Sequence, residues 1–272
     1  MLEPGSRLAG YEILDMLGRS ACAAAYRARE PETERQVVLT VPRKGAFADV
    51  TFAERFIAEG NRARKLAHPA IARVLAAGED QGLLYLATEL VEGTTLEARL
   101  ASSGRVPLEQ ALTITREVAA ALAHAHASGV IHRDLRPSRI VLLARSGVKV
   151  KDFGVARSYA EVRLTSSDIF VGTPTYTPPE AEDPQDLDHR SDLYSLGIIL
   201  FEMLQAHPPF AAASLIELVR AHREHKFPTL EQLRHPIPRP VWELMERLCR
   251  KDPDERFQSA AELIEALGRV AG

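Results

Sequence analysis

The sequence predicts an α+β protein in which a smaller, β-rich part is followed by a larger helical part. Residues 11–90 contain mainly short strand-like runs around a single helical pattern, whereas long helical patterns dominate after Gly93. The chain has 272 residues, which is long for one hydrophobic core and favours two lobes. We expect the link between the two parts near Glu89–Gly93.

The first part contains five strand-like runs. A loop of small residues at 18–24 separates the first two runs, and Pro42 ends the third, as expected after a buried β-branched strand. A turn at 79–82 separates the last two. The predicted strands are 11–14, 25–28, 36–41, 71–76 and 83–90.

One helix is predicted in the first part, over residues 52–66. Apolar residues such as Phe52 and Phe56 recur there at helical spacing. The dipeptide His68-Pro69 then ends the pattern, because a proline disfavours helical backbone in the residue before it.

Helices dominate the second part. The clearest covers residues 108–128, with Gly129 closing its C-terminus. The other helices are predicted at 192–205, 214–225, 241–249 and 259–269.

Composition excludes several classes of protein. The net charge of −3 gives no sign of a nucleic-acid surface, and no apolar run approaches the roughly 18 residues of a membrane span. The first ten residues lack the apolar core of a signal peptide. Two distant cysteines, Cys22 and Cys249, suit a reducing compartment, so we expect a cytoplasmic location.

The nine histidines show no zinc-binding spacing. His124 and His126 lie two residues apart, and His222 and His225 three apart, within predicted helices. We expect all four on helix surfaces.

Two loops, each with one aspartate, indicate the chemistry of the protein. Asp134 lies in a loop with a histidine and three arginines, and Asp152 follows the next strand-like run. Two carboxylates at successive strand ends suit phosphate and metal chemistry, in which one positions a hydroxyl and the other holds a divalent cation. For the first loop taken alone, a solvated basic turn with one ion pair is the alternative.

The ordered set of motifs resembles the eukaryotic-like serine/threonine protein kinase domain, especially its bacterial members. The matching residues, in the order in which that family has them, are Gly18, Glu59, His68-Pro69, His132-Arg133-Asp134, Asp152-Phe153-Gly154, Gly172-Thr173, Pro178-Pro179-Glu180, Asp192 with Gly197, and Arg256.

This resemblance implies a bilobal kinase-like fold over residues 1–272. The N-lobe would cover about 8–90, with one main helix, and the helical C-lobe about 94–270, joined by a hinge at about 89–93. The resemblance also implies two scaffold contacts: a buried ion pair between Glu180 and Arg256, and backbone N–H groups of the catalytic loop bound by Asp192.

The sequence departs from the family where phosphate is held. Only Gly18 remains of the three phosphate-loop glycines, whose flexible backbone lets N–H groups approach phosphates. Thr40 stands at the position of the strand-three lysine, nineteen residues before Glu59, the lysine's usual partner. A threonine hydroxyl is uncharged and too short to replace that lysine.

An apolar purine site is still expected from the resemblance. Ala25 and Val38 would form its ceiling, and the two substitutions roughly conserve volume. Val141 would form the floor, Thr88 the gatekeeper, and Glu89–Val91 the hinge contacts.

The catalytic loop departs as well. Asp134 keeps the position of the base, but Arg136 replaces a lysine and Arg139 replaces the asparagine that binds a second magnesium ion. A guanidinium has no acceptor and repels a metal ion. It is expected to pair with Asp134 or with Asp152, the remaining metal position.

These changes favour a pseudokinase, a scaffold or allosteric partner of an active kinase or another signalling protein, with weak or no phosphoryl transfer. The first alternative is a weak or atypical Ser/Thr kinase using ATP and Mg²⁺, with Thr173 supporting the base. The second is an ATP-binding conformational switch without catalysis.

The segment after Asp152 is rich in hydroxyl side chains. In the family, an arginine such as Arg133 receives a phosphorylated activation loop. Another kinase is therefore expected to phosphorylate this segment, and a plain polar loop is the alternative. The candidate sites are Thr165, Ser166, Ser167, Thr173 and Thr175.

Overall fold

The computed structural model describes residues 2–20, 22–43, 51–154, 174–182 and 187–270. The chain forms two compact units. The first comprises Met1–Ala67, Ile71–Glu92 and Asp152–Val171, and the second comprises His68–Ala70, Gly93–Lys151 and Gly172–Gly272.

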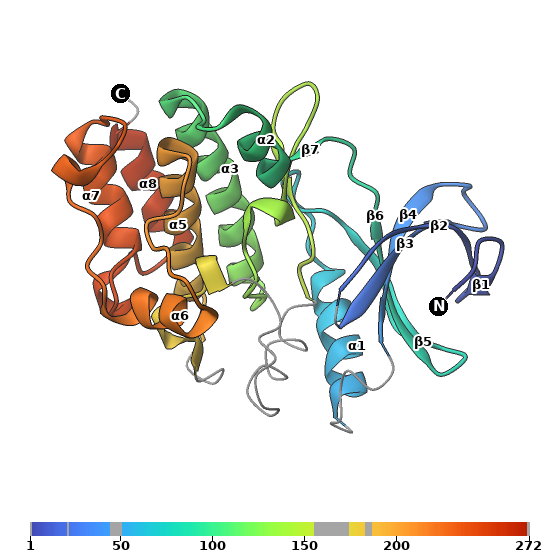
Figure 1. Cartoon of the computed structure of the whole chain (residues 1–272). Coiled ribbons are helices and arrows are strands. Elements are labelled where there is room, and N and C mark those ends of the chain that lie inside the picture. The colour runs from blue at the N-terminus through green and yellow to red at the C-terminus, as the bar shows by residue number, and fades with distance from the viewer. Residues whose placement is uncertain (1, 21, 44–50, 155–173, 183–186, 271–272) are drawn as a thin grey trace. The chain divides into compact units, whose positions relative to one another are not determined.

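The first unit is built on one antiparallel sheet (Figure 1). Its strand order is β1-β2-β3-β4-β6-β5. The strands are β1 (Arg7–Leu8), β2 (Tyr11–Arg19), β3 (Ala23–Arg29), β4 (Gln36–Pro42), β5 (Val74–Asp80) and β6 (Leu83–Glu89).

Alternation along the central strands gives the sheet two different faces. On β3 the residues Ala24, Tyr26 and Ala28 are buried, and on β4 the residues Val37, Leu39 and Val41 are buried. All six belong to one apolar cluster, which also includes residues of β1, β2 and β6. Because side chains alternate along a strand, the residues between them lie on the opposite face.

Helix α1 (Phe52–Ala63) covers that opposite face. It buries Phe52, Phe56, Gly60 and Ala63, which recur at helical spacing, and it packs on β5 and β6. Gly60 makes the closest approach to the sheet, where a Cβ atom would overlap the Cβ of Ala77 and lie 2.9 Å from Cδ1 of Leu86.

We expect Gly60→Ala to lower the free energy of unfolding by about 1–3 kcal/mol. Alanine favours a helix interior by up to about 1 kcal/mol, but the overpacking against the sheet outweighs this gain. Gly268→Ala is the matched control, because Gly268 lies in helix α8 (Ala260–Val270) with open space around it. Urea denaturation should show destabilisation for the first variant only, and equal stability of both would contradict the packing argument.

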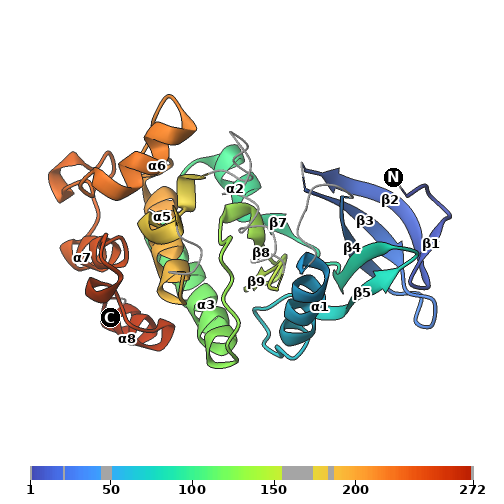
Figure 2. The same ribbon diagram turned by 90° about the horizontal axis from the view of Figure 1, so that it is seen from below.

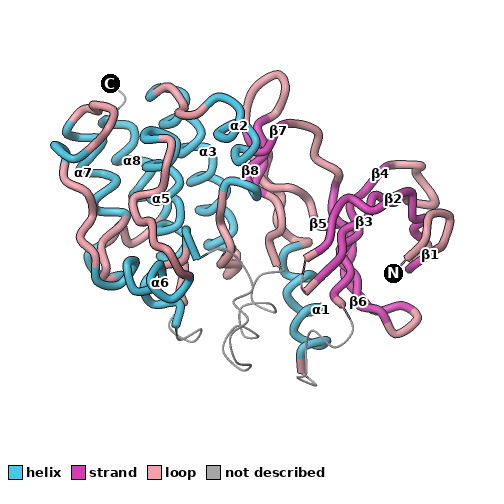
Figure 3. Tube along the Cα trace, viewed as in Figure 1, coloured by secondary structure: helices cyan, strands magenta, loops and turns pink. Residues whose placement is uncertain are grey.

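The second unit is mainly helical (Figure 3). Helix α5, which buries nearly all of its residues, packs against α3 and α7, and α8 packs against α3 and α7 (Figure 2). The helices are α2 (Leu96–Ser103), α3 (Leu108–Ala127), α5 (Arg190–Gln205), α6 (Leu215–Glu224), α7 (Arg239–Leu248) and α8 (Ala260–Val270).

A small antiparallel sheet in the second unit joins β7 (Thr94–Thr95), β8 (Ile140–Leu142) and β9 (Val148–Val150). Gly93, with φ +155°, lies directly on β8. A Cβ atom there would overlap the carbonyl oxygen of Leu142 and lie 2.8 Å from Cγ1 of Val141. Glycine is therefore required where the chain enters the second unit.

The predicted α+β class with a β-rich first part and a helical second part is confirmed. Gly129 follows α3 with φ +69°, as predicted for the residue that ends this helix. Two predictions of local structure were wrong. The strand predicted at 71–76 lies at Val74–Asp80, and the loop predicted at 18–24 is much shorter, because Gly18 and Arg19 continue β2 and pair with Ala25 and Ala24.

Within the part of the chain that the structure describes, none of the helices combines the length and apolarity that a bilayer crossing needs.

Candidate functional site

The loop that carries Asp134 runs from the end of α3 to β8 and is held by Asp192. The Oδ2 atom of Asp192 accepts the backbone N–H of His132, and Oδ1 accepts that of Arg133, both at 2.8 Å. Nε2 of His126 lies 2.8 Å from the same Oδ2. The predicted contact between Asp192 and the loop backbone is therefore confirmed, and His126 joins it from α3.

The charge of Asp192 is stabilised by these contacts. Burial alone would raise the pKa of this carboxyl, but the hydrogen bonds and the nearby histidines hold the pKa below its usual range. Arg133 has φ +62°, a conformation that is rare outside glycine. The Asp192 contact to the N–H of Arg133 helps to hold this turn, so the loop keeps a fixed shape.

The carboxylate of Asp134 is engaged by two arginines. The Oδ2 atom of Asp134 accepts a hydrogen bond from Nη2 of Arg139 at 3.2 Å, and Nε of Arg136 lies 3.5 Å away. The side chains are less than one-third exposed, between 27% and 29%. The expected pairing of Arg139 with Asp134 is therefore present.

This arrangement changes what the loop can do chemically. The Oδ2 atom of Asp134 faces two guanidinium groups, which donate hydrogen bonds and accept none. A divalent cation beside Arg139 would meet like charge. Across the described residues, no three or more His, Cys, Asp or Glu side chains group in a way that could hold a metal ion.

The turn between β2 and β3 stands where the resemblance places the phosphate loop. The N–H of Ser20 donates to the carbonyl oxygen of Ala23 at 2.8 Å. The Oγ atom of Ser20 accepts the N–H groups of Cys22 (3.3 Å) and Ala23 (3.1 Å). Three backbone N–H groups of this segment are therefore used inside the turn.

Sequence reasoning missed this role of Ser20. A serine whose hydroxyl accepts backbone N–H groups two and three residues later is a recognised turn signal. Gly18, the one family glycine that remains, has no positive φ and lies in the strand with open space beside it.

The candidate nucleotide residues of the first unit share one face of the sheet. Thr40 lies opposite Ala25 on β3 and opposite Leu86 on β6, and Val38 lies opposite Thr88. Since Leu86 is also the residue that α1 packs on, this is the face covered by the helix that carries Glu59. The structure thus brings Thr40 and Glu59 to the same side of the sheet.

The Asp152-Phe153-Gly154 motif packs on α1. Phe153 is buried, and Asp152 and Gly154 have φ values of +69° and +80°. A Cβ atom on Gly154 would lie 2.7 Å from the Cβ of Ala63 and 2.9 Å from the carbonyl oxygen of Glu59. A glycine is required at this approach, and it fixes Asp152 next to the helix.

The remaining candidate residues lie in other elements of the two units. Val141 is buried in β8 of the second unit, and Glu89 and Val91 are half-buried at the end of β6 and beyond it. Thr175 is half-buried in the turn Pro174–Tyr176. Thr165, Ser166, Ser167 and Thr173 lie outside the described residues.

Glu180 is tied to the helical unit by a buried ion pair. Its Oε1 atom accepts a hydrogen bond from Nη1 of Arg256, and its Oε2 atom accepts one from Nη2, both at 2.7 Å. The Arg256 side chain is completely buried. Ser191 donates to the same carboxylate at 2.9 Å. The predicted Glu180–Arg256 contact is therefore confirmed.

The histidines correct an earlier expectation. His126 and His222 were expected on helix surfaces, but the side chain of His126 is only 9% exposed and His222 is buried. Nδ1 of His222 lies 2.9 Å from the hydroxyl of Tyr194, and Lys251 donates to the carbonyl oxygen of His222 at 2.5 Å. Periodicity alone did not show these polar partners, which come from other elements.

We expect the stability of the protein to fall as the pH decreases from about 6.5 to about 4. Burial, and secondly the charge of Lys251, lower the pKa of His222 to about 4. The unfolded chain therefore binds more protons in this window, and unfolding becomes easier by up to roughly 3 kcal/mol. Urea denaturation across the window should show a smaller loss for His222→Asn, and an unchanged loss for the exposed control His225→Asn. Equal pH dependence in both variants would exclude His222 as the cause.

Comparison with known proteins agrees with this geometry. The sequence model of the protein kinase domain matches residues 11–266. The chain is 30% identical over 260 residues to the serine/threonine-protein kinase PrkC of Bacillus subtilis, covering 95% of this chain and 40% of PrkC. It is 35% identical over 266 residues to PknB of Mycobacterium leprae, covering 96% of this chain and 43% of PknB. The chain thus spans about two-fifths of the length of these curated relatives.

Solved structures show the same relationship. A crystal structure of the PknI kinase domain of Mycobacterium tuberculosis superposes with a TM-score of 0.79 and 29% sequence identity, and covers 99% of both chains. The match to the family extends over nearly the whole chain. The chain therefore belongs to the protein kinase domain family.

Proposed function

We propose that this kinase domain is catalytically impaired and acts mainly by binding a protein, either an active kinase or another signalling protein. The observation that carries the proposal is the hydrogen bond from Arg139 to Asp134, supported by Arg136 on the same oxygen. Phosphoryl transfer depends on positioning and electrostatics, so a cation on the base position opposes it.

The fit of this chain to ATP and Mg²⁺ is partial. Ala25 and Val38 offer a small apolar surface for a purine on the face that also holds Thr40. The closed turn at Ser20 and the loss of the lysine leave fewer groups for phosphates. Asp152 retains one carboxylate for a metal ion. The sequence position of the second magnesium ligand carries Arg139, whose guanidinium has no acceptor for a metal ion.

A weak or atypical Ser/Thr kinase is the second candidate. It is favoured by the Asp192 contacts, which hold the loop of Asp134 in a defined shape. In that case Asp134 would accept the proton of a protein hydroxyl after Arg139 moves aside, with Asp152 holding one Mg²⁺. The third candidate, an ATP-binding switch without catalysis, rests on the apolar face formed by Ala25 and Val38.

Thermal-shift titration with ATP, with and without Mg²⁺, separates these candidates, because a ligand that binds only the folded state raises Tm by mass action. We expect a small or absent shift at millimolar ATP and little effect of Mg²⁺. A Mg²⁺-dependent shift combined with radiolabel transfer that Asp134→Asn abolishes would overturn the proposal in favour of the kinase. A shift without transfer would instead favour the switch.

The regulatory part of the proposal concerns phosphorylation by another kinase. The candidate sites are Thr165, Ser166, Ser167, Thr173 and Thr175, and Arg133 is the residue that would receive a phosphate. Mass spectrometry after co-expression with a related active kinase tests this, and a spectrum without added phosphate in this segment would contradict it. Cysteine usage and the need for an intracellular phosphate donor favour a cytoplasmic site of action.

A further inference from the structure

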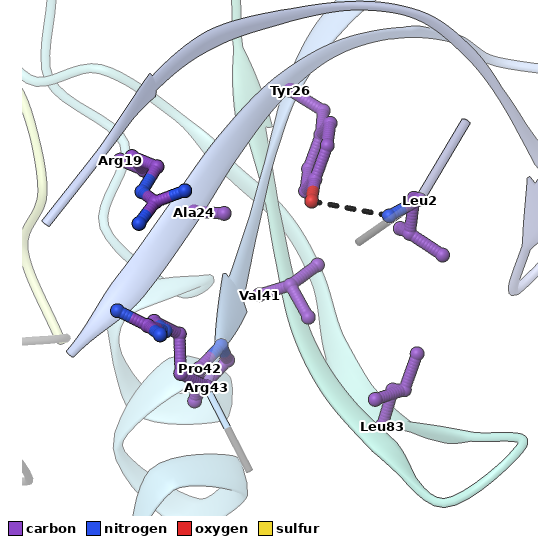
Figure 4. A pocket seen from close by; sticks show the side chains of 8 residues that line it. All are labelled: Leu2, Arg19, Ala24, Tyr26, Val41, Pro42, Arg43 and Leu83. Atoms are coloured by element: carbon purple, nitrogen blue, oxygen red, sulfur yellow. Dashed lines mark hydrogen bonds between the residues drawn. The ribbon is translucent and has the colours of Figure 1, made fainter. Parts of the chain in front are cut away.

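A cavity of about 450 Å³ opens on the apolar face of the first unit's sheet, away from the face that α1 covers. Figure 4 shows its lining. Ala24, Tyr26 and Val41 form the floor, and Leu2 and Leu83 contribute one side. The cavity lies at the end of the sheet where β2 and β3 turn, next to the turn at Ser20.

The apolar part of this cavity is lined by buried side chains and held by a hydrogen bond. The alanine at position 24 leaves space between larger neighbours on β3 and β4 that are themselves buried. The backbone N–H of Leu2 donates to the hydroxyl of Tyr26 at 3.2 Å, which holds the N-terminal segment over one side of the opening. Cavities of this volume, with mostly apolar walls and a few polar groups, are typical of small-molecule sites.

The polar part of the cavity is cationic. The side chains of Arg19 and Arg43 lie on the side opposite Leu2 and Leu83 (Figure 4), and none of the lining residues is acidic. Two arginine side chains at one mouth give this side of the cavity a positive charge, which favours an anionic group over a cationic one. Guanidinium groups also bind carboxylates and phosphates through paired hydrogen bonds.

We infer that this cavity binds a small amphipathic anion, an aliphatic chain that ends in a carboxylate or a phosphate. The chain would lie over Ala24, Tyr26 and Val41, and the anionic head would lie between Arg19 and Arg43. The site is on the opposite side of the sheet from Thr40 and does not use the kinase-like residues.

Such a ligand would act on the turn that replaces the phosphate loop. Arg19 directly precedes Ser20 in β2. The backbone N–H of Arg43 donates to the carbonyl oxygen of Cys22 at 2.8 Å, and Nη1 of Arg43 lies 3.5 Å from the carbonyl oxygen of Ser20. Both ligand-binding arginines are therefore attached to the turn, so occupancy of the cavity and the conformation of the turn are linked.

Isothermal titration of the full chain with decanoate and with decyl phosphate tests the inference and distinguishes the two head groups. We expect saturable binding of one molecule per chain by at least one of these probes. Decyltrimethylammonium, which has the same chain and the opposite charge, should not bind. No heat from either anion at 1 mM, or equal binding of the cation, would overturn the inference.

Two variants locate the site. Arg43→Glu should weaken binding by at least about tenfold, because it replaces a charge-assisted contact with repulsion. Arg7→Glu is the matched control, since Arg7 is an exposed arginine of β1 that does not line the cavity. Equal loss of affinity in the two variants would show only general charge attraction and would contradict the site.

A third variant tests the apolar part. Ala24→Ile should abolish binding by filling the floor of the cavity, and its melting temperature shows whether the sheet remains folded. If this variant does not fold, the comparison of Arg43→Glu with Arg7→Glu still decides. The measurements do not involve phosphoryl transfer, so their outcome is independent of the proposed function.

Discussion

The double variant Thr40→Lys, Arg139→Asn is expected to transfer phosphate from ATP at least about 100-fold faster than the natural chain. Removing one well-placed charge-stabilising group from an enzyme typically costs 10²–10³ in rate, and this variant restores two groups. The asparagine adds an oxygen acceptor for a metal ion and removes the nearer of the two guanidinium groups from Oδ2 of Asp134. The lysine adds a positive charge on the face of the sheet that α1 covers with Glu59.

The measurement is radiolabel transfer to a generic protein substrate with Mg²⁺-ATP. Asp134→Asn in the double variant is the control, and it should return the rate to background because it removes the base position. Each single substitution should have a smaller effect, since groups of one active site act together. Transfer by the natural chain that already equals that of the double variant would contradict catalytic impairment by Thr40 and Arg139.

Arg256→Ala is expected to lower the free energy of unfolding by about 3–5 kcal/mol, the range found when one partner of a buried ion pair is removed. The change leaves the carboxylate of Glu180, which is only 11% exposed, without its bidentate partner. It also removes hydrogen bonds from the guanidinium to the carbonyl oxygens of Arg250 (2.8 Å) and Lys251 (3.0 Å).

Chemical denaturation followed by circular dichroism measures this effect. Arg220→Ala is a suitable control, because Arg220 forms an exposed pair with Glu224 on α6 and its loss should have no measurable effect. The double variant Glu180→Ala, Arg256→Ala should lose less stability than the sum of its single variants, because the two residues interact directly. A loss no greater than that of the control would show that the buried pair does not stabilise the fold.

Periodicity predicted most of the elements of this fold. The alternation on β3 and β4 and the helical spacing of Phe52 and Phe56 are consequences of burying one face, so they can be recognised without coordinates. The two short strands β1 and β7 were missed because two residues carry no period. The predicted start of strand β5 was three residues too early in the sequence. Ile71 and Ala72 are apolar because they are buried in the segment before the strand, and the prediction counted them as strand residues.

The candidate site was predictable in part. The ordered motifs led to Asp134, Asp152 and Arg139, and charge complementarity limited Arg139 to two partners. The contact between Arg139 and Asp134 depends on the path of the loop, and periodicity does not determine this path. The partners of His126 and His222 lie far away in sequence, so their burial depended on tertiary packing that no local pattern reports.

The contacts of Asp192 have a consequence for how this domain can be recognised. The loop around Asp134 is held by a carboxylate and backbone N–H groups of the chain itself, so contacts within the second unit set its conformation. A partner that binds this loop would lose little conformational entropy from it, since the ordering is complete before the encounter.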